Sequence, residues 1–124
     1  MKIEVSPGEL VDKVTILAIK LEKISDPAKL ANIRREYELL QKEMAAGGIS
    51  ESLPEYERLM GINRKLWEIE DRIRAREAAG TFDDEFIELA RSVYFENDKR
   101  AAIKREINVR FGSELIEEKQ YTAY

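Results

Sequence analysis

The amino-acid sequence predicts an all-α protein: an antiparallel arrangement of four helices, built from one short and one long helical hairpin. Apolar residues recur every three or four positions along most of the chain, which is the spacing of helices with a buried face. Residues typical of helix starts, such as proline, and of helix ends, such as glycine, interrupt this pattern. The chain has 124 residues, so we expect a single helical domain over residues 1–124.

The first two helices are predicted to form the short hairpin. Ser6 precedes a proline and is followed three residues later by Glu9, which is typical of a capped helix start. The apolar pattern then continues to about residue 24 and covers two sides of the helix, as in the central helix of a bundle. Asp26, again followed by a proline, is expected to cap the second helix, whose single apolar stripe ends at Gly47.

The third and fourth helices are predicted to form the long hairpin. Ser52 is expected to cap the third helix, which ends before Gly80. Thr81 or Asp83 is expected to cap the fourth, which ends before Gly112. With 1.5 Å per residue, each of these helices should be ~40 Å long.

The two terminal segments show a different pattern. Residues 2–5 alternate between polar and apolar in the manner of a strand, and residues 118–124 do so more loosely. The sequence therefore leaves open a small pairing of the terminal segments beside the helical body.

The difference in length between the hairpins predicts a homodimer. The long hairpin should extend beyond the short one, and the overhang should expose Tyr56, Leu59, Ile103, Ile107 and Phe111. This is more apolar surface than a monomer usually exposes, and a two-fold partner is the commonest way to cover it.

The composition excludes several classes of function. The chain has no cysteine and no histidine, which excludes disulfides, thiolate catalysis, histidine-based triads and the usual zinc sites. Its net charge of -4 argues against nucleic-acid partners and against binding to membrane surfaces. No apolar run is long enough to span a bilayer, and the first residues do not resemble a secretory signal, so we expect a cytoplasmic protein. No cofactor is expected.

Polar residues interrupt the apolar stripe of the fourth helix. After Val93, the positions expected to face inward carry Asn97, Arg100 and Lys104. Pairing the two long helices about their connection places Asn97 and Arg100 near Asn63 of the third helix. One interpretation is a buried polar network that fixes the register of the helices. The other is the floor of a ligand site between helices.

Carboxylates spaced one helical turn apart are a second group of candidates. Glu68, Glu70 and Asp71 lie on the third helix, and Glu9 precedes Asp12 by one turn on the first. Such pairs on facing helices hold magnesium in all-helical nucleotide pyrophosphohydrolases of the MazG kind. The Glu-Glu-x-x-Glu partner motif of those enzymes is missing here, and in a chain with 25 acidic residues this spacing is expected by chance. Solvated faces with ion pairs one turn apart are therefore favoured, and no metal site is predicted. A chorismate-mutase-like bundle is disfavoured because the order of its motifs does not match.

Five segments together resemble a family of small bacterial and phage proteins of unknown function. They are SPGELVDKVTIL at 6–17, LWEIEDRIR at 66–74, ARSVY at 90–94, NDKRA at 97–101 and EEK at 117–119. The resemblance covers nearly the whole chain. It implies a stand-alone bacterial or phage domain and carries no catalytic residue over to this sequence.

The function that the sequence favours is a non-catalytic cytoplasmic module for interaction or assembly, and whether the protein is an enzyme is left open. The alternative is a small all-helical enzyme or ligand-binding bundle, similar to the magnesium-dependent pyrophosphohydrolases. Its candidate ligand-binding residues are Asp12, Asn63, Glu70, Asp71, Asn97, Arg100 and Lys104.

Overall fold

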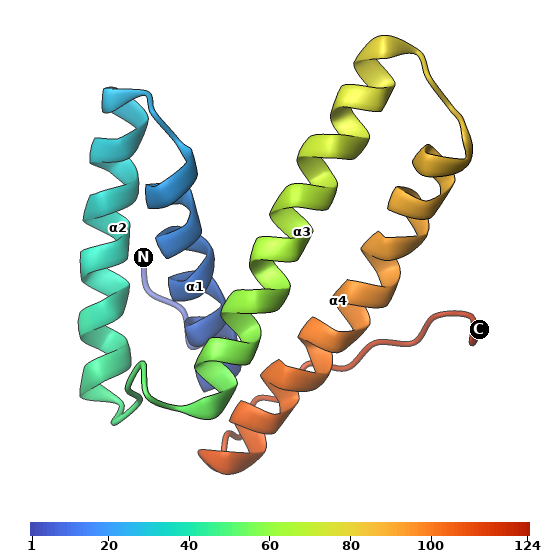
Figure 1. The fold of residues 1–124 in the computed structure, drawn as a ribbon. Helices are drawn as coiled ribbons and strands as arrows, with labels where there is room; N and C mark the ends of the chain where they lie inside the picture. The colour runs from blue at the N-terminus through green and yellow to red at the C-terminus, as the bar shows by residue number, and fades with distance from the viewer.

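The computed structural model describes all 124 residues and contains four helices and no strands. The helices are α1 (Pro7–Lys23), α2 (Pro27–Ala46), α3 (Pro54–Ala79) and α4 (Asp84–Arg110). Figure 1 shows α1 and α2 as a short antiparallel hairpin beside the long hairpin of α3 and α4. The predicted all-α fold with a short and a long hairpin is confirmed.

Local capping explains where three of the helices begin. The side chains of Ser6, Asp26 and Asp83 each accept a hydrogen bond from a backbone N–H in the first turn of α1, α2 and α4. The start of α3 differs from the prediction, because its N-cap is Leu53 and no side chain caps it. Ser52, the expected cap, instead donates its backbone N–H to the hydroxyl of Ser50 at 3.1 Å, within the preceding turn.

The expected pairing of the terminal segments is wrong. Residues 1–5 are exposed and form no strand. After Ser113, no backbone N–H of the last eleven residues donates to another backbone group. Side chains hold this C-terminal tail against α4: Glu117 pairs with Lys104, and Tyr124 bonds to Asp98. An isolated two-stranded ribbon is marginal in water, so side-chain anchoring prevails here.

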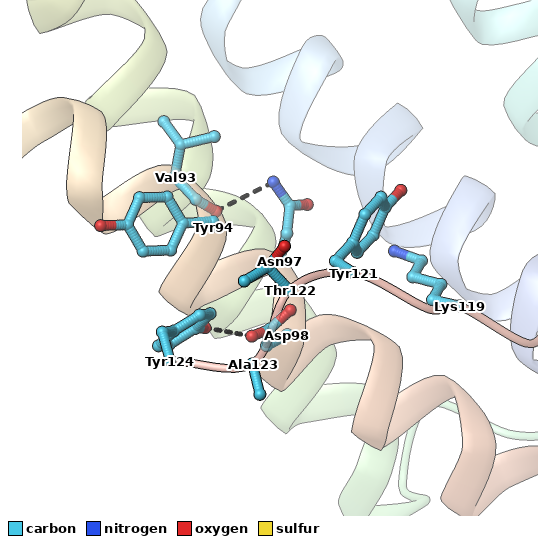
Figure 2. Close-up of a pocket in the computed structure, with 9 residues that line it drawn as sticks. All are labelled: Val93, Tyr94, Asn97, Asp98, Lys119, Tyr121, Thr122, Ala123 and Tyr124. Carbon is cyan, nitrogen blue, oxygen red and sulfur yellow. Dashed lines mark hydrogen bonds between the residues drawn. The ribbon is translucent and has the colours of Figure 1, made fainter.

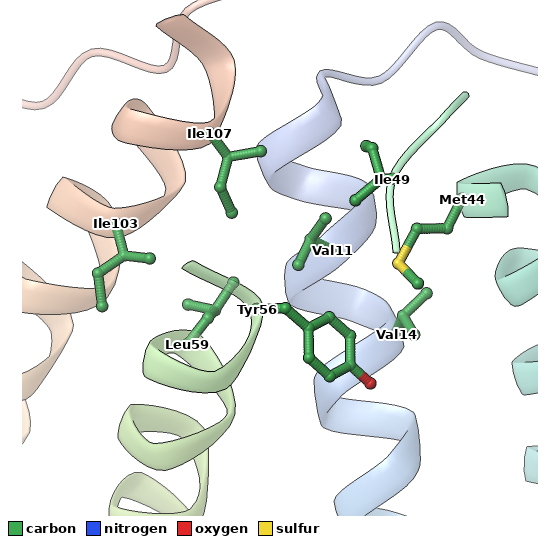
Figure 3. Packing of buried hydrophobic residues seen from close by; sticks show 8 residues of the cluster. All are labelled: Val11, Val14, Met44, Ile49, Tyr56, Leu59, Ile103 and Ile107. Atoms are coloured by element: carbon green, nitrogen blue, oxygen red, sulfur yellow. The ribbon is translucent and has the colours of Figure 1, made fainter. Parts of the chain in front are cut away.

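The apolar core lies where all four helices come together. It is a cluster of eight buried residues, shown in Figure 3: Val11, Val14, Met44, Ile49, Tyr56, Leu59, Ile103 and Ile107. Helix α1 packs against each of the other three helices, whereas α2 packs against α1 alone. The central place of α1 is the one predicted from its two apolar faces.

The long hairpin extends beyond the short one at the end opposite to the one predicted. The expected overhang residues Tyr56, Leu59, Ile103 and Ile107 are buried in the core, and Phe111 packs against it. All four helices begin or end together at the core, because α1 packs across the start of α3 and the end of α4. The projecting part is therefore the turn between α3 and α4 with the helix halves next to it. We call residues 67–95 the arm.

A glycine sets the close approach of α1 to α4. A Cβ atom at Gly8 would lie 2.4 Å from the carbonyl oxygen of Lys104. We expect Gly8→Ala to lower the free energy of unfolding by about 1–3 kcal/mol, the usual cost of overpacking. The same change at Gly61, a mid-helix position where an added Cβ would meet no other atom, should raise it by about 1 kcal/mol through helix propensity. Urea unfolding of both variants measures this difference, and a neutral Gly8→Ala would contradict the close packing.

Candidate functional site

The contact between α1 and α4 is polar over most of its length. On α4, one residue per turn faces α1, and these residues follow one another at intervals of three or four, which places them on one side of the helix. Each bonds to α1 or to a neighbour in the row. We call this cluster the polar seam, with its members Glu9, Asp12, Thr15, Asn63, Asn97, Arg100, Lys104 and Asn108.

Asp12 is the centre of the polar seam, with only 1% of its surface exposed. Arg100 donates two hydrogen bonds to it, from Nε to Oδ1 at 2.9 Å and from Nη2 to Oδ2 at 2.5 Å. This bidentate geometry is among the strongest arrangements between two side chains. The hydrogen bond to Asp12 raises the pKa of Arg100 above its ordinary value.

Two further side chains complete the surroundings of Asp12. Asn63 donates from Nδ2 to Asp12 Oδ1 at 3.0 Å and to Thr15 Oγ1 at 2.9 Å. The hydroxyl of Thr15 in turn donates to the backbone oxygen of Asp12 at 2.8 Å. Three helices therefore meet at one buried carboxylate, and every buried side-chain polar atom of the polar seam has a partner.

The end of the polar seam at Lys104 and Asn108 is also held by ion pairs and a hydrogen bond. Lys104 is buried and its Nζ lies 2.8 Å from Glu9 Oε2 and 3.3 Å from Glu117 Oε2. Burial alone would lower the pKa of Lys104, but the hydrogen bond with Glu9 and the nearby carboxylates raise it, so the ammonium stays charged. Next to it, Asn108 accepts a hydrogen bond from the backbone N–H of Gly8 at 2.7 Å. That amide belongs to the first turn of α1, so Asn108 satisfies one of its free donors.

The structure brings five of the seven candidate ligand-binding residues into the polar seam. Asn97 joins through its oxygen, which accepts from Arg100 at 3.3 Å. Glu70 lies outside and forms an exposed ion pair with Arg74 at 3.1 Å. Asp71 is exposed and has no hydrogen bond or ion pair. The five residues in the polar seam are Asp12, Asn63, Asn97, Arg100 and Lys104.

Two hollows adjoin the polar seam at Asn97. A pocket of about 210 Å³ lies between α1, α3 and α4, and its lining includes the apolar side chains of Leu66 and Trp67 and the guanidinium of Arg100. A larger cavity of about 1060 Å³ lies between α4 and the C-terminal tail. Figure 2 shows Val93 and Asn97 on its α4 side and Tyr121 on its tail side.

Sequence reasoning missed two buried carboxylates. Glu96 is only 4% exposed, and its Oε1 accepts from Lys65 at 2.9 Å and from Lys99 at 3.2 Å. Burial raises the pKa of Glu96, but the two lysines outweigh this effect and lower it overall. Glu55 accepts similarly from Arg110, and the hydrogen bond lowers its pKa. In each of these carboxylates, Oε2 has no partner.

A signal for Glu96 was present in the sequence. The inward positions of α4 follow one another at intervals of four and three residues. Glu96 lies three residues after Val93 and four before Arg100, so it falls on this inward side. Sequence reasoning considered only Asn97, which lies on the α1 side of α4, and overlooked its neighbour Glu96, which is buried and bonds to Lys65 of α3. Asn108 and Thr15 had no comparable signal, because their roles depend on the position of another helix.

No group of three or more acidic side chains lies close enough together to hold a metal ion. Glu68 and Asp71 are both exposed. We therefore expect that magnesium leaves the Tm of the protein unchanged. A ligand that binds only the folded state must raise the Tm. A rise of several degrees that is lost in Asp71→Ala would contradict this expectation and indicate a metal site.

Comparison with known proteins shows the family of the chain. No curated protein and no solved structure matches the chain. No helix of the structure is both long and apolar enough to cross a membrane. The model of the group described as "Family of unknown function (DUF6165)" matches residues 1–124, and the protein therefore belongs to this family.

Proposed function

We propose that the protein is a non-catalytic interaction module of the bacterial or phage cytoplasm, and that it binds its partner through the arm. The observation that carries the proposal is the exposure of large apolar side chains on a projecting pair of helices. Exposed fractions are 59% for Phe82, 52% for Ile87 and 43% for Tyr94. On the whole outer surface of α2, by contrast, Leu39 is the only large apolar residue exposed to this degree.

The physical reason lies in the geometry of a two-helix arm. Two helices can bury only the sides that face each other, and the core that buries the remaining sides lies at the other end of the molecule. Contiguous apolar surface on a soluble monomer usually marks a site of interaction. The arm is thus a projecting part of the fold where a partner would bury apolar side chains that the protein itself leaves exposed.

The polar seam supports a structural role for the candidate residues. Its carboxylate, guanidinium and amide groups bond to one another rather than to open space, as in a network that fixes helix register. Asp12 already has three donors, so it is poorly placed to act as a base or as a metal ligand.

A position-specific crosslinking experiment tests the proposal. A photoreactive amino acid replaces Ile87 on the arm or, as a matched control, Leu39 on α2, and the protein is irradiated in its native cells. Both positions are exposed, so both report contacts of the folded chain. We expect discrete adducts from position 87 and none from position 39. Equal crosslinking at the two positions, or none at position 87, would contradict the proposal.

A homodimer is the second candidate, because Phe82 and Ile87 at the tip of the arm can pack against the same residues of another copy. In the crosslinking experiment, this assembly would give an adduct of twice the chain mass of 14.4 kDa. Light scattering of the purified protein would show the same doubled mass. Ile107, which the sequence placed at the dimer contact, is fully buried and cannot take part.

A further inference from the structure

On the side of α1, helices α3 and α4 together form a face that we call the groove, and α1 covers only part of its length. Next to the core, α1 occupies it, and the polar seam lies in this part. Ile16 and Ile19 of α1 line the 210 Å³ pocket together with Leu66 and Trp67 of α3. Farther out, Figure 1 shows α3 and α4 continuing without any helix against them.

The row of α4 residues that faces α1 continues into this empty part, where its residues change from polar to apolar. Beside α1 the row consists of polar residues, ending at Asn97. At the same helical spacing the next positions outward are Val93, Ala90 and Phe86, all half-buried. On α3, Trp67 and Ile73 are also half-buried. The empty part of the groove is thus apolar on α4, whereas on α3 the row through Trp67 and Glu70 continues with the exposed residues Arg74 and Glu77. A helix that filled it as α1 fills the other part would need an apolar face beside charged residues.

The net charge of the arm indicates the charge of the helix that would bind there. Residues 67–95 contain eight acidic and four basic residues, a net charge of -4, and this equals the net charge of the whole chain. The remainder of the protein is therefore neutral overall. Glu70 lines the pocket at the start of the empty groove. Such a surface attracts a partner of positive charge and repels a second copy of itself.

We propose that the empty part of the groove, from Trp67 and Asn97 to the tip of the arm, binds a basic amphipathic helix of another protein. This inference rests on the proposed function and names the partner class for the arm. The apolar face of the helix packs on Trp67, Ile73 and Val93, and its lysine or arginine residues lie beside the acidic residues of the arm. The C-terminal tail, held by side chains alone, borders the groove at Val93 and can adjust to the occupant.

Trp67 reports binding directly, because it is the only tryptophan of the chain and lies in the groove. The probe is a four-turn amphipathic peptide of leucine and lysine, and the control is the same peptide with glutamate in place of lysine. We expect a saturable change in Trp67 emission with the lysine peptide that weakens as salt is added, and no change with the glutamate peptide. Equal responses to both peptides would overturn the proposal.

Three variants locate the binding site. Val93→Glu places a charge in the apolar part of the groove, and Glu70→Lys reverses an exposed charge at its start. Each should weaken binding of the lysine peptide roughly tenfold or more. Glu38→Lys changes the chain's net charge by the same amount on the exposed side of α2 and should leave binding within about twofold. Circular dichroism shows whether each variant is folded. If Val93→Glu unfolds, the measurement on Glu70→Lys alone tests the binding site.

Binding that is unchanged in Glu70→Lys and in a folded Val93→Glu variant would overturn the groove assignment.

The remaining outcomes separate this inference from the proposed function. If the lysine peptide fails to bind while position 87 still crosslinks to another protein, the partner class is wrong and the interaction through the arm stands. If neither occurs, both are wrong. If light scattering shows a doubled mass that Val93→Glu abolishes, a second copy fills the groove, and the inference is overturned.

Discussion

Asp12→Ala is expected to lower the free energy of unfolding by about 3–5 kcal/mol, the usual cost of breaking a buried ion pair. The substitution leaves the guanidinium of Arg100, whose side chain is 29% exposed, without its bidentate partner. It also removes an acceptor of Asn63, whose amide is buried between α1 and α3. Arg100 would then keep only Asn97, and Asn63 only Thr15, as a side-chain acceptor, so each group would be under-bonded in a desolvated place. Urea unfolding followed by circular dichroism gives the change.

The control for this prediction is Glu70→Ala, which removes an exposed ion pair with Arg74. We expect it to change stability by less than about 0.5 kcal/mol, because water screens exposed pairs. A double-mutant cycle of Asp12→Ala with Arg100→Ala measures the coupling between these two residues. If Asp12→Ala is no more destabilising than Glu70→Ala, the polar seam does not hold α1 in place.

Ile107→Glu is expected to prevent folding or to cost ~5 kcal/mol or more, since it removes a buried side chain and buries an unpaired carboxylate. Ile107 is fully buried, in the cluster that joins all four helices. A domain has only about 5–15 kcal/mol of stability to lose. The far-ultraviolet circular dichroism of the purified variant at 25 °C measures the remaining helix content.

Val109→Glu is the matched control, because it makes the same kind of change two residues away on the same helix. Val109 is 69% exposed, so a carboxylate there remains in water. We expect its Tm to lie close to that of the unchanged protein. A folded Ile107→Glu variant with reduced mass in light scattering would instead restore the dimer contact that the sequence suggested.

Substitutions in the polar seam and in the arm should separate folding from binding. Asp12 bonds within the protein and lines neither the small pocket nor the cavity beside the tail. Its replacement should therefore lower stability and leave the affinity of the folded fraction unchanged. Glu70→Lys should do the reverse, because Glu70 is exposed and pairs only with a neighbour on its own helix.

Local patterns in the sequence determined the helices of this protein. A helical period repeats within a turn, and a cap bonds within three residues, so neither needs the rest of the chain. Ser6 and Asp26 therefore begin α1 and α2 at the predicted places, and glycine follows the ends of α2 and α3. The short connections between consecutive helices also determined the two antiparallel hairpins.

Only the tertiary structure decided how the two hairpins meet. The end at which the helices align depends on contacts between distant parts of the chain, such as that of Gly8 with Asn108. No periodic pattern records such a contact, so the overhang was assigned to the wrong end and Ile107 to the wrong environment. For the same reason, the sequence selected Asp12 and Arg100 as candidates, but only the packing of α1 against α4 made them partners.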